Sequence, residues 1–171
     1  MNDEIIFAVR FNKDVEGEGH GYWFSIINLT DDTNQTKALK ECYKDGDKRK
    51  DLITYVKVED KVCVMNKFKD IKSATYNTVG NDQIILRYAD VLLMYAEACA
   101  KTNDVNGANT ALKLVRKRAG LADKTFAQSD LMLEIEHQCL LEFFGEGHRF
   151  DDLKRWYTTE EIKNIFTENE K

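Results

Sequence analysis

The hydrophobic pattern of the chain changes once, near residue 82, and this change limits the folds that are open to it. Before that point, short apolar or alternating runs are separated by glycine, asparagine and aspartate, as in strands joined by loops. After it, apolar residues recur at helical spacing. The pattern predicts a mainly α fold with a smaller β- and loop-rich N-terminal part. We therefore divide the chain into a β/loop-rich segment at 1–81, a helical region at 82–157 and a charged tail at 158–171 that is expected to be exposed or frayed.

Two pairs of strands are predicted in the first segment. Residues 5–11 and 22–29 are candidate strands on either side of an acidic, glycine-rich loop, and residues 52–58 and 62–68 flank a short charged turn as a hairpin. The loop lacks the Lys and Ser/Thr that follow a phosphate-binding loop, and its glutamates would repel a phosphate. The segment therefore predicts a small sheet structure without a nucleotide site.

The helical region is expected to form two successive helical hairpins, the unit of tetratricopeptide-like packing. A first helix from residue 82 to 101 has one apolar face, made of Ile84, Tyr88, Val91, Tyr95 and Cys99. A second helix is capped by Asn103 or Asp104 and stops at Gly120, which tolerates the left-handed conformation. Its inward residues are Ala108, Leu112, Val115 and Ala119.

The second hairpin begins with a helix at residues 129–144 that is apolar on two sides and is therefore expected to lie deep between neighbours. One side carries Leu131, Ile135, Cys139 and Phe143, and the other carries Leu133, Leu140 and Phe144. A shorter helix at 148–157 follows a break at two glycines and presents Phe150, Leu153 and Tyr157.

The composition excludes several classes of function. The 25 basic and 30 acidic residues give a net charge of -5, the wrong sign for neutralising phosphates, so nucleic acid is not an expected partner. No apolar run approaches the roughly 18 to 20 residues of a membrane span, and the acidic N-terminus carries no export signal. The four cysteines form no C-x-x-C pair and have no histidine at zinc-like spacing, so neither a metal nor a cofactor is predicted.

Three motifs in the helical region stand in the order typical of the SusD/RagB family. They occupy residues 87–98, 111–121 and 142–156, and a Gly-Asp-x-Arg stretch at 46–49 is similar to a further family motif. Over residues 82–157 the chain resembles the C-terminal half of that family. The resemblance implies a SusD-like α-α superhelix and a surface-exposed lipoprotein of the bacterial outer membrane. It also implies non-catalytic binding of glycans or other nutrients, delivery to a SusC-like TonB-dependent transporter, and membrane contact only through a lipid anchor that this chain lacks.

The chain also departs from the family pattern. Where the family usually has Glu-Arg-Arg, this sequence has Gln138, Cys139 and Leu140, so a charged network expected there is missing. Family members commonly carry a proline at the position of Ile84, whereas this chain contains no proline at all. We therefore expect a C-terminal fragment or a diverged, truncated member.

The acidic residues of the last motif have two interpretations. Glu142 and Glu146 lie four apart on one helix, and a glycoside hydrolase would need two carboxylates about 5 to 10 Å apart across a sugar. Pairing with the neighbouring bases His148 and Arg149 is the favoured interpretation, and hydrolysis by Glu142 and Glu146 is an alternative. No catalytic residue is predicted. The residues expected to be structural parts of the family motifs are Arg87, Glu97, Glu142, Glu146, His148, Arg149 and Asp152.

The candidate ligand-binding residues are His20, Tyr22 and Trp23, beside the glycine-rich loop. Aromatic rings match the apolar faces of sugar rings, and a histidine can hydrogen-bond hydroxyl groups. The competing interpretation is an alternating strand in which Tyr22 belongs to the core and Trp23 merely points outward. A helical-repeat scaffold that binds protein only is the remaining alternative function.

Overall fold

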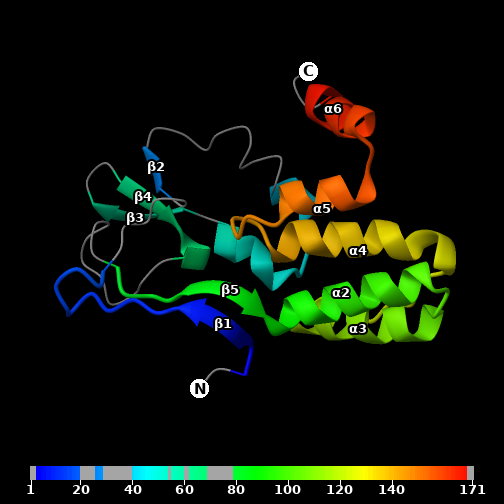
Figure 1. Cartoon of the computed structure of the whole chain (residues 1–171), viewed down its shortest axis with the longest axis horizontal. Coiled ribbons are helices and arrows are strands. Elements are labelled where there is room, and N and C mark those ends of the chain that lie inside the picture. Colours follow the sequence, from blue (N-terminus) through cyan, green and yellow to red (C-terminus); the bar gives the residue numbers. More distant parts are fainter. Residues whose placement is uncertain are drawn as a thin grey trace.

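The computed structural model of the chain describes residues 3–19, 26–28, 40–53, 55–59, 62–68 and 79–168. Strands gather toward one end of the long axis and the three longest helices occupy the other (Figure 1). The mainly helical fold with a smaller β part is therefore confirmed. Within the described residues, no helix is both long enough and apolar enough to cross a bilayer.

The first sheet joins the two ends of the molecule. Strand β1 (Ile5–Val9) pairs antiparallel with β5 (Gln83–Arg87), and β5 runs directly into helix α2 (Tyr88–Lys101). The backbone N–H of Tyr88 donates to the carbonyl oxygen of Glu4 at 2.7 Å, which fixes the point where strand becomes helix. The prediction that this helix begins near residue 82 is wrong, because residues 83–87 find a strand partner far away in the sequence.

The second sheet has the strand order β2-β4-β3, with β2 at Ile26–Asn28, β3 at Tyr55–Glu59 and β4 at Val62–Met65. Strands β3 and β4 pair antiparallel, so the predicted hairpin is confirmed. Its outer ends are shorter than predicted, because Lys48–Ile53 and Asn66–Phe68 form the short 3-10 helices η1 and η2.

Helix α3 (Val105–Arg118) is defined by local signals at both ends. The carboxylate of Asp104 accepts the Gly107 N–H at 2.9 Å and caps the first turn. Gly120 adopts φ +82°, and the N–H of Leu121 folds back to the carbonyl oxygen of Arg116 at 3.0 Å. The four residues predicted to face inward are all buried, namely Ala108, Leu112, Val115 and Ala119.

Helix α2 buries a different face from the one predicted. Tyr88, Val91 and Tyr95 are 47%, 41% and 53% exposed, and of the predicted helical stripe only Cys99 is buried. The buried side carries mainly small residues, Ala89, Leu93, Ala96 and Ala100, which pack in one cluster with α3. Small side chains let two helix backbones approach closely, so the apolar aromatic stripe is left outside.

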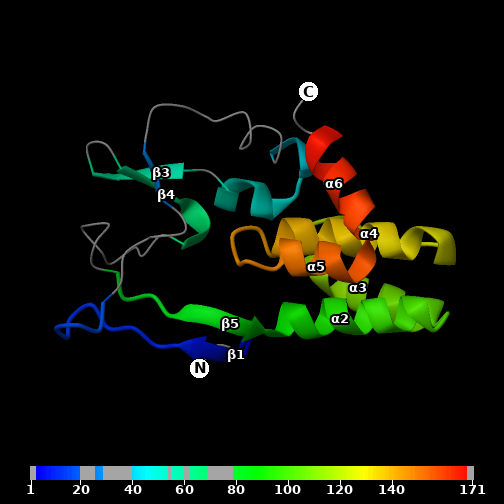
Figure 2. The same cartoon turned by 45° about the horizontal axis from the view of Figure 1, so that its top comes forward.

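The remaining helices are α4 (Gln128–Glu142), α5 (Arg149–Trp156) and α6 (Thr159–Glu168). The first apolar side of α4 lies in the core as predicted, with Leu131, Ile135, Cys139 and Phe143 all buried. On the second side Leu133 is 72% exposed, so α4 is not buried between apolar neighbours on both sides. Residues 159–168 form a helix rather than a frayed tail, and in both views α6 lies beyond α5 on the outside of the helical part (Figures 1 and 2).

Candidate ligand-binding site

A buried arginine stands where β5 meets α2. Arg87 is 6% exposed, and each of its five N–H donors has an acceptor. Its Nε donates to Glu146 at 2.8 Å, and its Nη1 donates to Glu142 at 2.6 Å and to Glu4 at 3.0 Å. Its Nη2 donates to the backbone oxygen of Glu142 and to the second carboxylate oxygen of Glu146. Arg87 is therefore saturated and ties the strand, α2 and the end of α4 together.

The two glutamates that were candidates for hydrolysis are held ionised. Burial would raise the pKa of Glu142, but the hydrogen bond from Arg118 and the charges of Arg87 and Arg118 outweigh it and hold that pKa at about 2. The pKa of Glu146 is likewise lowered, since hydrogen bonds and charge from Arg87 and Lys67 overcome its burial. Neither carboxyl group is protonated near neutral pH, so neither is prepared to act as a general acid.

Lys67 in η2 connects the β-rich part to the end of α4 through hydrogen bonds. Its Nζ donates to the backbone oxygens of Glu142 at 2.9 Å and Phe144 at 2.8 Å, and to the carboxylate of Glu146 at 2.5 Å. These three contacts use all three N–H bonds of the ammonium group. Burial lowers the pKa of Lys67, and the charge of Glu146 partly restores it.

The Gly-Asp-x-Arg stretch extends the same network. Arg49 makes a bidentate pair with Asp47, with its Nη2 at 2.7 Å from Oδ2, and its Nη1 donates to Glu142 at 3.1 Å. Gln138 is fully buried, accepts from Arg49 at 3.0 Å and donates to Glu134 at 2.9 Å. The expectation that Gln138, Cys139 and Leu140 leave the network missing is therefore wrong, because the glutamine amide links its charged members.

A second group of ion pairs lies on the other side of α4. Arg155 donates to Glu97 at 2.9 Å and to Asp152 at 2.7 Å, and both acids are buried. His148 Nδ1 lies 3.4 Å from an oxygen of Asp90, and burial raises the pKa of that carboxyl group. These residues border a smaller cavity of about 420 Å³.

The predicted ion-pair role of the last motif is correct in kind but wrong in its partners. Glu142 and Glu146 pair with bases from distant elements and not with His148 and Arg149. Arg149 instead donates to Glu136 at 3.0 Å. Helix α5 starts at Arg149, after the chain has turned away from the end of α4, so these bases face other acids.

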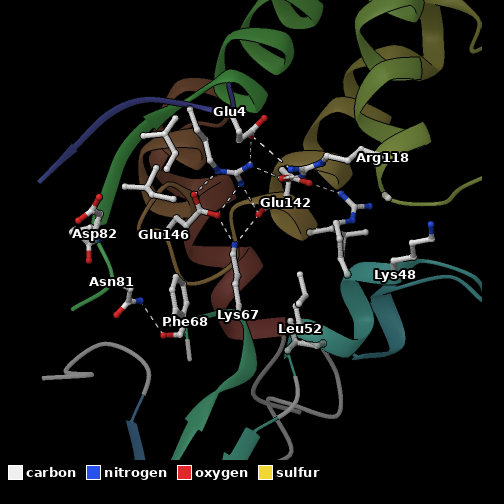
Figure 3. Close-up of a pocket in the computed structure, with 18 of the residues that line it drawn as sticks. Glu4, Lys48, Leu52, Lys67, Phe68, Asn81, Asp82, Arg118, Glu142 and Glu146 are labelled. Carbon is white, nitrogen blue, oxygen red and sulfur yellow. Dashed lines mark hydrogen bonds and ion pairs between the residues drawn. The ribbon is translucent and has the colours of Figure 1, made fainter. Parts of the chain in front are cut away.

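A larger cavity lies directly over the Arg87 network (Figure 3). Its volume is about 670 Å³, within the roughly 300 to 1,000 Å³ of small-molecule sites. The charged floor consists of Arg49, Lys67, Arg87, Glu142 and Glu146, and the apolar walls include Ile5, Leu52, Ile53, Phe68 and Ile84. In Figure 3, Lys48 and Arg118 lie on one side of it, and Asn81 and Asp82 lie on the opposite side.

The predicted ligand-binding residues His20, Tyr22 and Trp23 lie outside the described residues. The sequence reasoning missed the roles of Lys67 and Glu4, which come from the β-rich segment and carry no local motif. Arg49 and Arg118 lay inside the stretches that resemble the family, and this was the signal available for them. Among the described residues, no group of three or more potential ligands is placed to hold a metal ion.

A family model and several solved structures are similar to this chain. The model of the SusD family matches residues 34–171. The surface glycan-binding protein A of Bacteroides uniformis is 25% identical with a TM-score of 0.65, and the match covers 89% of this chain and 37% of that protein. No curated protein has a significant sequence match to the chain.

Two further structures show the same fold at lower identity. A SusD superfamily protein from Parabacteroides distasonis is 21% identical with a TM-score of 0.66, covering 88% of this chain and 38% of that one. The surface glycan-binding protein A of Bacteroides thetaiotaomicron, solved in complex with laminarihexaose, is 22% identical with a TM-score of 0.62, covering 89% and 42%. The chain thus spans about two fifths of the length of the solved structures that it matches.

Proposed function

Because the chain belongs to the SusD family, we propose that it takes part in binding glycans or other nutrients at the bacterial outer-membrane surface without cleaving them. We further propose that the bound nutrient passes to a SusC-like TonB-dependent transporter. The observation that carries the binding proposal is the family match, together with the solved relative that holds laminarihexaose. The cavity of about 670 Å³ offers a site of suitable size on this chain.

The state of the carboxylates supports binding over hydrolysis. A retaining or inverting glycosidase needs one carboxyl group that is protonated at working pH. Glu142 and Glu146 are both ionised and share the guanidinium of Arg87. Protonating either of them would break contacts that hold β5 to α4.

The test is affinity gel electrophoresis of the purified protein in gels that contain laminarin, amylopectin, arabinoxylan or polygalacturonate, with serum albumin as the non-binding control. We expect retardation by at least one glycan and no new reducing ends when the protein is incubated with it. Release of reducing ends by the purified protein would contradict the proposal and would indicate a hydrolase instead. Delivery to a transporter is tested by co-purification of the tagged protein with a TonB-dependent transporter from outer membranes.

One observation favours a second candidate, a scaffold that binds protein. Several large apolar side chains are exposed along β1, β5 and α2, and exposed apolar patches commonly mark contact surfaces. These side chains are Ile6, Phe7, Val9, Ile85, Leu86, Tyr88, Val91, Met94 and Tyr95. Loss of retardation on every glycan, with a stable transporter complex retained, would make this the better description.

A further inference from the structure

The cations on the floor of the larger cavity have almost no hydrogen-bond donors left for a ligand. Arg87 uses all five of its N–H donors and Lys67 uses all three, each on protein oxygens. Arg49 has four of its five donors engaged. A ligand that enters the cavity would therefore find a satisfied floor and would have to be recognised at the rim.

Two cations at one side of the rim keep free donors. Arg118 is half exposed, and within the described residues its single hydrogen bond goes to Glu142. Lys48 is exposed, and its ammonium group makes no ion pair with any residue that the structure describes. Their backbones lie close together at the end of α3, because the Lys48 N–H donates to the carbonyl oxygen of Ala119, the residue after Arg118, at 2.9 Å.

The charge balance around the cavity leaves this side positive. Glu142 is already shared by Arg87, Arg49 and Arg118, and Glu146 is shared by Arg87 and Lys67. Glu4, the acid nearest to Arg118 after Glu142, also accepts from Arg87. The acids therefore have partners, and the charge of Lys48 remains without one among the described residues.

We infer that this cavity binds an acidic saccharide, with a uronic-acid carboxylate seated between Lys48 and Arg118. The inference rests on the proposed glycan-binding function and names the class of glycan. A neutral sugar offers hydroxyl groups, which are best met by side chains that both donate and accept. The spare groups on this side only donate and are charged, which matches a carboxylate. The exposed side chain of Leu52 and the ring of Phe68 provide apolar surface for a pyranose ring.

The experiment compares each acidic glycan with its own neutral counterpart. Polygalacturonate, alginate and glucuronoxylan oligosaccharides are titrated against the intact chain by calorimetry, beside the same oligosaccharides after chemical reduction of the carboxylates to alcohols. We expect at least one acidic form to bind about tenfold more tightly than its reduced form, the effect of one charge-assisted hydrogen bond. The difference in affinity between the acidic and the reduced form should decrease between about 0.1 and 1 M salt, because the Debye length falls from about 10 Å to about 3 Å.

Substitutions test which residues cause the tighter binding of the acidic form. Lys48→Gln and Arg118→Gln should each reduce the preference for the acidic form, and the two together should bring the acidic and reduced forms to the same affinity. Thermal unfolding is measured to separate loss of binding from loss of fold. Lys50→Gln is the matched control, because Lys50 belongs to the same short helix but does not line the cavity. Equal binding of both forms by the unmodified protein, or a preference that is unchanged when Lys48 and Arg118 are both replaced, would overturn the inference while leaving glycan binding intact. Absence of binding to every glycan would instead defeat the proposed function.

Discussion

Replacing Glu142 by glutamine should destabilise the chain by about 3 kcal/mol, because it removes the charge that three guanidinium groups share. Glu142 is 4% exposed and pairs with Arg49, Arg87 and Arg118. Removing one partner from a buried ion pair typically costs about 3 to 5 kcal/mol. The lower end applies here, since Arg87 and Arg49 keep their other carboxylates and Arg118 reaches solvent.

The lowered pKa of Glu142 arises from the same contacts and corresponds to a cost of the same order. This pKa falls from an ordinary 4.5 to about 2, and about 2.5 pH units at about 1.4 kcal/mol each amount to about 3 to 4 kcal/mol. A lowered folded-state pKa means that this stabilisation is complete above 4.5 and is lost as the pH falls toward about 2. The difference in stability between Glu142→Gln and the unmodified protein should therefore narrow across that interval.

Urea denaturation followed by far-ultraviolet circular dichroism measures both effects, with the unfolding midpoint shifted and the slope unchanged. Glu160→Gln is the matched control, because Glu160 lies 3.6 Å from Lys163 with both side chains mostly exposed, and it should change stability by less than about 0.5 kcal/mol. A cost below about 1 kcal/mol for Glu142→Gln at neutral pH, or a difference that does not narrow in acid, would refute the account of the network.

Other substitutions test the fold around the site. Leu112→Ala, at a fully buried position, should cost about 2 to 5 kcal/mol in urea denaturation, and a small cost would contradict the packing of α2, α3 and α4. Gly120→Ala should lower the free energy of unfolding by about 1 to 2 kcal/mol, because alanine is strained at the φ of +82°. The added carbon would also lie 3.1 Å from the backbone oxygen of Gly46, and this close contact should increase the loss. Gly17→Ala has the same φ but open space, so an equal cost would show that this contact is unimportant. Tyr95→Lys should leave the free energy of unfolding within about 0.5 kcal/mol while reducing the fluorescence of an apolar dye, since Tyr95 is 53% exposed; a strong destabilisation would place it in the core.

Helix α3 could be predicted from the sequence because its determinants are local. Asp104 caps it, Gly120 ends it, and the inward residues follow the helical period. Helix α2 could not, because its start depends on residues far away. Ile84 and its neighbours are apolar in either a helix or a strand, and only the pairing of β5 with β1 decides between the two.

The buried face of α2 was mispredicted for a related reason. The helix carries two apolar stripes, one of large residues such as Tyr88 and Tyr95 and one of small residues such as Ala89 and Ala96. Periodicity fits both stripes equally well, and side-chain size favours the wrong one. Helix α3 determines which stripe is buried, because its small residues Ala108 and Ala111 allow the stripe of small residues to pack closely against it.

Within the stretches that resemble the family, the buried network and the candidate ligand contacts use different residues, and the donor count explains why. Arg87, Glu142 and Glu146 satisfy one another and Lys67, so replacing any of them breaks buried ion pairs and leaves buried hydrogen-bonding groups unsatisfied. Such residues are constrained by the fold whatever the ligand is, and this makes them good markers of a family and poor markers of specificity. Lys48, by contrast, is exposed, and its ammonium group pairs with no acid among the described residues, so a substitution of its side chain changes the surface that a ligand meets at little cost to folding. The residues that decide which ligand is bound are therefore expected at exposed positions on the rim of the cavity, such as Lys48, the variable position of the Gly-Asp-x-Arg stretch.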